Sequence, residues 1–180
     1  MKTLIVYFSL TGSTRKICAA LQKNMDAEME ALRPQRRYCT LGARALGTFA
    51  AARRMERPIF PLKEDVSAFD RIVLATPVWG GHLPPPVVTF LRCYDLRDKP
   101  VYLLLTHSGN PGQVEQVALE EVKHSEGILS GITLMETMPK LMNGLEDQAL
   151  VLWLNTEEGK VRIEQMAKGY PNITRPNRRA

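Results

Sequence analysis

The sequence is poor in cysteine and contains no long apolar run. The three cysteines (Cys18, Cys39 and Cys93) form no C-x-x-C pair and no metal-ligand spacing, and an odd number argues against a disulfide framework. We therefore expect reduced cysteines that behave as small apolar residues in a cytoplasmic protein, and no metal site. The N-terminal run contains one early lysine and fits neither a signal peptide nor a transmembrane helix. No membrane span is predicted.

Several catalytic and nucleotide-binding patterns are also missing. The chain contains neither G-x-x-x-x-G-K-[ST] nor G-x-G-x-x-G, which mark nucleoside-triphosphate and dinucleotide loops. Ser9 and Ser108 lack the setting of a nucleophile elbow, so a hydrolytic triad is not expected.

The charge is unbalanced toward the positive side. The formal net charge is +5 and the pI is near 9.2, with much of the excess in "RPQRRY", "AARRMERP" and "RPNRRA". No aromatic residues are interleaved with these arginines, and no nucleic-acid-binding module is recognisable. We interpret the runs as a solvated basic surface with a frayed tail and expect no nucleic-acid partner. The alternative is an anionic ligand or a partner protein.

What the chain does contain is an alternation of two kinds of segment. Continuously apolar β-type runs lie at 3–8, 71–76 and 100–106, and weaker runs lie at 28–34 and 131–137. Between them, apolar residues recur at helical spacing, as in Ile17, Leu21 and Met25, in Val87, Phe90, Leu91 and Tyr94, and in Val114, Val117, Ala118 and Val122. Five strands with intervening helices predict a doubly wound parallel α/β sheet with helices on both faces.

The boundaries of the elements can also be estimated. Pro84, Pro85 and Pro86 predict the start of one helix, and Asn110 with Pro111 predicts the N-cap and first position of another. Residues 40–57 have a helical pattern, and whether 35–63 forms a lid stays open. We expect one domain over 1–170, ending in a helix or helix pair, and a basic tail over 171–180.

Three loops follow strands and should meet at the carboxyl edge of the sheet, where ligands of such sheets bind. The loop at 9–14, "SLTGST", offers hydroxyls and backbone N–H groups at a helix N-terminus and predicts a phosphate site without a cation. The loop at 76–84 carries Trp79 between small residues, either as a stacking surface for a flat group or buried against a neighbouring helix. The loop at 106–112, "THSGNPG", adds small polar groups. Together they suit a phosphorylated aromatic cofactor.

The residues in these loops resemble those of the flavodoxin family, whose members bind FMN. Ser9-x-Thr11-Gly12-x-Thr14 matches the family's phosphate loop, and "TPVWGG" and "YDLRDKPVYLLLTHSGNPG" are similar to its ring-binding loops. The resemblance covers roughly residues 1–125. It implies a flavodoxin-like sheet of order 2-1-3-4-5.

The resemblance also implies which residues hold the cofactor. The phosphate would be held by Ser9, Thr11, Gly12, Ser13 and Thr14. The flavin ring would be lined by Thr76, Pro77, Val78, Trp79 and Gly80. Its pyrimidine side would be bordered by Thr106, His107, Ser108, Gly109 and Gly112.

The chain departs from the family in the third loop, which has neither the aromatic residue nor the acids that many flavodoxins place beside the flavin. An open second face of the ring suits hydride transfer to a substrate, unless Tyr38 or Phe49 covers it. His82 and His107 are the catalytic candidates, with polar rim residues as the alternative, and His124 is read as a surface residue.

We interpret the chain as an FMN-dependent oxidoreductase that passes two electrons from NAD(P)H or a reduced flavin to a quinone-like acceptor. Its expected partners are a small-molecule electron donor and acceptor and a redox partner protein. The alternatives are an electron-transfer flavodoxin without its own substrate, and a flavodoxin-like binding or regulatory module. The oligomeric state is not predicted.

Overall fold

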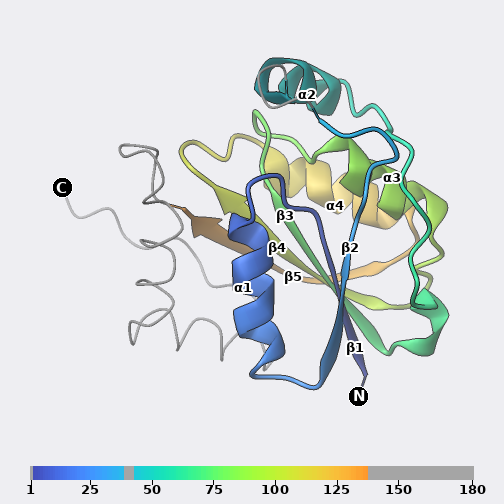
Figure 1. The fold of residues 1–180 in the computed structure, drawn as a ribbon. Helices are drawn as coiled ribbons and strands as arrows, with labels where there is room; N and C mark the ends of the chain where they lie inside the picture. The colour runs from blue at the N-terminus through green and yellow to red at the C-terminus, as the bar shows by residue number, and fades with distance from the viewer. Residues whose placement is uncertain (1, 39–42, 138–180) are drawn as a thin grey trace.

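The computed structural model describes residues 2–38 and 43–137 and contains one five-stranded sheet (Figure 1). Its strands are β1 (Thr3–Tyr7), β2 (Ala27–Ala31), β3 (Arg71–Pro77), β4 (Pro100–His107) and β5 (Ile128–Glu136). All neighbouring pairs are parallel and the order is β2-β1-β3-β4-β5, so the expected flavodoxin-like order is confirmed. The carboxyl ends of the strands therefore share one edge.

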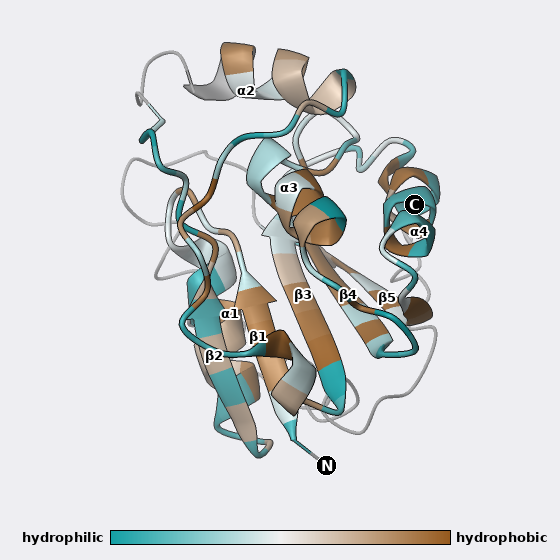
Figure 2. Cartoon of the chain, turned by 90° about the vertical axis from the view of Figure 1, so that its right-hand side faces the viewer, coloured by the Kyte–Doolittle hydropathy of each residue, from teal (hydrophilic) through white to brown (hydrophobic). Residues whose placement is uncertain are grey.

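The helices cover both faces of this sheet. They are α1 (Ser13–Gln22), α3 (Pro85–Cys93) and α4 (Val114–His124), whereas α2 (Ala43–Ala52) lies beyond the carboxyl edge (Figure 1), and a short 3-10 turn spans Val66–Ala68. On one face, Ile17 and Leu21 of α1 pack with Ile5 of β1. Residues of α3 and α4 pack on the other face, where Phe90 and Val114 share a cluster with Leu4. Alternate residues of each central strand thus enter two different cores, which explains the continuously apolar runs. Figure 2 shows this as brown central strands beside the more hydrophilic edge strand β2.

Two predicted boundaries differ from the structure. The run at 28–34 was expected to be a strand throughout, but β2 ends at Ala31. Beyond it the chain leaves the sheet, and Pro34 forms an antiparallel bridge with Ile59. The predicted N-cap at Asn110 is wrong, because α4 begins at Val114 with Gln113 as its N-cap. Asn110 instead closes a local turn by accepting a hydrogen bond from the N–H of Gly112 at 2.9 Å.

Residues 33–38 and 43–60, which we call the arm, extend beyond the carboxyl edge of the sheet. The two ends of the arm pair with each other, because Gln35 N–H donates to Pro58 C=O at 2.9 Å and Phe60 N–H donates to Arg33 C=O at 2.8 Å. Between them, α2 lies over the carboxyl ends of the strands in both views (Figures 1 and 2). The predicted helix at 40–57 is therefore present as α2, over a shorter range.

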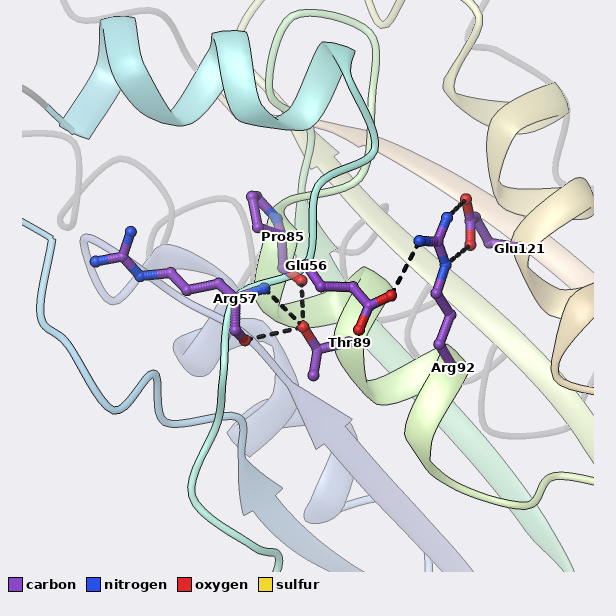
Figure 3. A network of polar contacts seen from close by, with 6 residues as sticks. All are labelled: Glu56, Arg57, Pro85, Thr89, Arg92 and Glu121. Atoms are coloured by element: carbon purple, nitrogen blue, oxygen red, sulfur yellow. Dashed lines mark hydrogen bonds and ion pairs between the residues drawn. The ribbon is translucent and has the colours of Figure 1, made fainter.

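The arm is fixed to α3 at its returning end (Figure 3). Arg57 N–H donates to the Thr89 hydroxyl at 2.8 Å, and Arg92 bridges Glu56 at 3.1 Å to the buried carboxylate of Glu121 at 2.9 Å. These contacts join the arm, α3 and α4.

The predictions for the C-terminal part of the chain, namely the final helix, the end of the domain at 170 and the tail over 171–180, concern residues outside the described ranges. Within 2–38 and 43–137, no helix combines the length and apolarity that a bilayer crossing requires.

Candidate functional site

The three predicted loops meet at the carboxyl edge of the sheet. The hydroxyl of Thr14, in the first turn of α1, lies 3.0 Å from that of Thr106 at the end of β4. Val78 N–H, after β3, donates to Thr106 C=O at 2.8 Å. Thr106 thus connects all three loops, as the topology requires of strands that neighbour one another in the order β1-β3-β4.

The first loop leaves backbone donors free at the start of α1. Gly12 is the N-cap in a left-handed conformation (φ 96°), and its own N–H donates to Ser9 Oγ at 3.1 Å. In the part of the chain that the structure describes, the N–H groups of Ser13, Thr14 and Arg15 have no acceptor. Open N–H groups at a helix N-terminus attract anions through their partial positive charge. This geometry fits a phosphate group.

The four hydroxyls of this loop are not equivalent. Thr11 is exposed, and its hydroxyl lies 3.3 Å from that of Ser13. Thr14 is buried, with 2% of its surface exposed, and its hydroxyl is engaged by Thr106. A ligand at the loop can therefore reach the hydroxyls of Thr11 and Ser13, whereas Thr14 contributes through its backbone N–H.

The second loop places Trp79 under the arm. Trp79 and His82 form a two-way backbone bridge, with N–H to C=O distances of 3.0 and 3.1 Å. The half-buried indole contacts Phe8 and Tyr38 edge to face, at centroid distances of 5.6 and 5.1 Å. It also lies against α2, since a Cβ added at Gly47 would be 2.7 Å from its ring. The indole thus has a helix contact, and it remains partly accessible.

Tyr38 is held between Trp79 and a cation. The guanidinium of Arg57 lies over its ring, 4.2 Å from the centroid. Burial raises the pKa of Tyr38 to about 12, and the charge of Arg57 acts in the opposite direction. Tyr38 is therefore a neutral phenol at physiological pH, and its oxygen is buried.

The third loop is shaped by local hydrogen bonds and touches the second. His107 Nδ1 lies 2.6 Å from Gly109 C=O, so this nitrogen carries the proton and donates it. A Cβ at Gly112 would lie 2.9 Å from the Cα of Gly81, so the two loops approach backbone to backbone. Only glycine permits that approach at φ 60°.

The two candidate catalytic histidines differ in how they are engaged. His82 Nδ1 is buried and has no partner among the described residues, whereas His107 Nδ1 stabilises its own loop. In the described part of the chain, no hydrogen bond joins the two rings. His124 is exposed at the end of α4, as expected.

A cavity of about 660 Å³ borders the first loop on the side of β2. It is lined by Tyr7, Phe8, Ser9, Leu10, Gly12, Arg15, Ala31, Leu32, Arg33, Pro34, Arg37, Tyr38 and Phe60. Sequence reasoning missed the three arginines, since it predicted a phosphate site without a cation and read "RPQRRY" as a solvated surface. Arg15, directly after the loop, was the available signal. The positions of Arg33 and Arg37 depend on the path of the arm.

One carboxylate near the third loop was also missed. None of the three loops contains an acid, but Glu136 at the end of β5 pairs in register with His107. Its side chain is exposed. A negative charge therefore lies near the third loop, although the loop itself contains no acid.

The cysteines and acids do not form a metal site. Among residues 2–38 and 43–137, no group of three His, Cys, Asp or Glu side chains could hold a metal ion. Cys18 is buried, and burial raises the pKa of its thiol, so it is an inert apolar residue as predicted. Cys93 is exposed rather than buried, because it lies outside the apolar stripe of α3. Cys39 lies outside the described residues.

Comparisons with known proteins agree with this geometry. The sequence profile of a family described as flavodoxin matches residues 2–157. No curated protein is significantly similar in sequence.

Solved structures with the same fold include a flavoprotein from Bacteroides eggerthii, with 22% identity, a TM-score of 0.62, and coverage of 86% of this chain and 96% of that one. A flavoprotein from Lactobacillus acidophilus, solved in complex with FMN, has 18% identity, a TM-score of 0.59 and coverage of 84% and 97%. The flavodoxin of Streptococcus pneumoniae has 14% identity, a TM-score of 0.54 and coverage of 94% and 97%. At these identities the structural likeness establishes the fold.

Proposed function

The chain belongs to the flavodoxin family, and on that premise we propose that it binds FMN and passes two electrons from NAD(P)H or a reduced flavin to a quinone-like acceptor. Its partners are then a small-molecule donor and acceptor. The unpaired thiols of Cys18 and Cys93 suit a reducing compartment, so we place this activity in the cytoplasm.

The first loop would hold the FMN phosphate. The free N–H groups of Ser13, Thr14 and Arg15 and the accessible hydroxyls of Thr11 and Ser13 would donate to it, with Ser9 and Gly12 shaping the turn. The guanidinium of Arg15 adds a positive charge beside the loop. Burial raises the pKa of Tyr7 in β1, and the charge of Arg15 acts in the opposite direction.

The second and third loops would hold the ring. Thr76, Pro77, Val78, Trp79 and Gly80 would line it on one side, with Trp79 as the stacking surface. Thr106, His107, Ser108, Gly109 and Gly112 would border its pyrimidine side. The edge-to-face contacts of Trp79 with Phe8 and Tyr38 fix the plane of the indole, so little rotamer freedom is lost on stacking.

When bound, FMN supplies the hydride and electron chemistry of such a reaction. The chain positions the ring and handles a proton. His82 and His107 both stay candidates for that proton, because His82 Nδ1 is buried without a partner among the described residues and His107, whose Nδ1 donates to Gly109, keeps its Nε2 for proton transfer. The arm limits the access of water, since α2 lies over the edge that carries Trp79.

The observation that carries the enzyme hypothesis is the charge at the site. Among the described residues, three arginines and no carboxylate line the cavity beside the phosphate loop, and the sequences of the three loops contain no acid. The lack of acids in the loops removes a charge that would oppose reduction of the flavin, and the arginines attract anionic small molecules. At an effective dielectric constant of about 20, one unit charge roughly 8 Å away is worth about 2 kcal/mol, or about 90 mV for one electron.

A second function, electron transfer to a partner protein, is favoured by a different observation. Leu46 and Phe49 of α2 are 73% and 54% exposed close to the predicted ring site. Exposed apolar side chains of this kind suit transient docking of a redox protein.

Anaerobic reduction of the FMN-loaded protein by NADPH and NADH, followed by addition of a quinone, separates these functions. The enzyme hypothesis predicts that one reductant bleaches the flavin and that the quinone restores its colour over many turnovers. His82→Gln should slow turnover and alter its pH profile, while His124→Gln, at an exposed position, should change neither. A flavin that neither nucleotide reduces, with two well-separated one-electron potentials, would support the carrier. A protein that binds no flavin would support a regulatory module.

A further inference from the structure

The cavity between β1, β2 and the arm is not accounted for by the flavin alone. Its walls include Ser9 and Gly12 of the phosphate loop but no residue of the ring-binding stretches at 76–80 and 106–112. It therefore lies on the β2 side of the phosphate loop, and it adjoins the predicted ring site through Phe8 and Tyr38, which contact Trp79. A volume of about 660 Å³ is within the range of small-molecule sites.

The charge of this cavity is one-sided. Arg15 belongs to α1, and Arg33 and Arg37 belong to the arm, so two separate elements contribute positively charged residues to the lining of the cavity. In the described part of the chain, none of these three side chains has a hydrogen-bond or ion-pair partner, and no carboxylate lines the cavity. Unpaired arginines facing a common cavity match phosphate groups, which they bind through paired N–H donors.

The remaining walls are apolar and partly aromatic. Phe8 is buried and Tyr38 is half-buried, whereas Leu10 and Phe60 are 39% and 49% exposed. A flat aromatic group gains area burial and ring contacts against such walls. The cavity therefore suits a ligand that combines a planar base with phosphates.

The segment of the arm that carries Arg33 and Arg37 is held in place by hydrogen bonds. Arg57 donates to Arg36 C=O at 3.0 and 3.2 Å while its guanidinium covers the ring of Tyr38. Arg57 is itself fixed to α3 through Thr89, as Figure 3 shows. The backbone that carries Arg33 and Arg37 is thus ordered before any ligand binds, which lowers the entropy cost of binding.

We infer that this cavity binds the phosphorylated adenosine half of a nicotinamide dinucleotide, with the base against the aromatic wall and the phosphates on Arg33 and Arg37. The inference rests on the proposed function, because it assigns a site to the electron donor. The arm then recognises the electron donor, and the two loops after β3 and β4 hold the flavin ring.

Calorimetric titration of the FMN-loaded protein with adenosine 2′,5′-bisphosphate and with adenosine tests the inference. The bisphosphate should bind, and adenosine should bind about tenfold more weakly or not at all, because it lacks the charged groups. Arg33→Gln and Arg37→Gln should each weaken bisphosphate binding about tenfold, the loss expected for one charge-assisted hydrogen bond. Raising the salt concentration should weaken it further.

Arg97→Gln is the matched control. It removes the same charge from an exposed position where Arg97 pairs with Glu126, and it should change binding by less than about twofold. Equal binding of the two probes, an equal loss in Arg97→Gln, or binding that disappears when FMN is loaded would each overturn the inference. The last result would assign the cavity to the flavin.

Failure of the inference and failure of the proposed function give different results. If NADPH reduces the flavin equally well in Arg33→Gln, Arg37→Gln and the natural sequence, the donor binds elsewhere and only the inference fails. If the bisphosphate binds with the expected arginine dependence but neither nucleotide reduces the flavin, the cavity is a nucleotide site and the reductase function fails.

Discussion

Two threonines in the phosphate loop are predicted to act through different physical effects, and substitutions at each separate them. Thr11 is exposed, so Thr11→Ala removes a hydroxyl that is free to contact a phosphate. Loss of a hydrogen bond to a charged group costs about 1.5–3 kcal/mol, so the FMN dissociation constant should rise about tenfold or more. The stability of the apoprotein should scarcely change, because among the described residues this hydroxyl makes only a 3.3 Å approach to Ser13 at the surface.

Thr14→Val should show the opposite pattern. Thr14 is 2% exposed, and its hydroxyl pairs with Thr106 at 3.0 Å. The substitution keeps the shape and leaves the Thr106 hydroxyl with only a 3.4 Å contact to Thr76 C=O. The free energy of unfolding should fall by about 1–3 kcal/mol, the cost of a buried group without a good partner. FMN affinity should change less than about threefold, since the backbone N–H of Thr14 is unaffected.

The assays are fluorescence titration of the apoprotein with FMN and with riboflavin, and urea unfolding of the apoprotein. Riboflavin lacks the phosphate, so neither variant should weaken its binding by more than about twofold. A tenfold loss of FMN affinity in Thr14→Val at unchanged stability would refute the reasoning, as would equal losses of FMN and riboflavin in Thr11→Ala.

Three further predictions concern the arm and its supports. Trp79→Ala should increase the fluorescence of bound flavin by removing the stacked ring, and unchanged emission would mean that Trp79 serves only the core. In an ordinary helix, a Gly→Ala substitution raises the free energy of unfolding by about 0.5–1 kcal/mol. Gly47→Ala should instead destabilise the apoprotein, because the new Cβ would lie 2.7 Å from the ring of Trp79. Gly109→Ala, whose Cβ meets open space, is its control, and a stabilised Gly47→Ala would contradict the close packing. Arg92→Met should lower the free energy of unfolding by about 2–4 kcal/mol, because it leaves the buried carboxylate of Glu121 unpaired. Glu56→Gln removes the exposed partner of Arg92 and should cost less than about 1 kcal/mol. Equal losses in the two variants would exclude a special role for the buried Arg92–Glu121 pair.

The sheet was predictable because its signal is local. β3 and β4 are buried on both faces, so their sequences are apolar without alternation, and both strands are present where that pattern predicted them. The end of β2 was not predictable, since the chain leaves the sheet to pair Pro34 with Ile59, a residue distant in sequence.

The site was predictable at the level of loops and not of side chains. Thr11 and Thr14 carry the same hydroxyl in sequence, and only the position of α1 against β4 turns one outward and the other onto Thr106. Arg33 and Arg37 belong to a basic run that gives no sign of facing a cavity, because the path of the arm decides it. The predicted N-cap at Asn110 failed for a related reason. The side chain of Asn110 accepts a hydrogen bond within a turn that lies three residues before the actual N-cap, Gln113.

The central claim is that the N-terminus of α1 binds the phosphate of FMN, and amide chemical shifts of isotope-labelled apoprotein test it most directly. Addition of FMN should shift the amide protons of Ser13, Thr14 and Arg15 strongly downfield, because these N–H groups have no acceptor until the phosphate arrives. Riboflavin at saturation should perturb the loops around Trp79 and His107 but leave those three amides nearly unmoved. Equal shifts of the three amides with FMN and riboflavin, or no shift with FMN, would contradict the account.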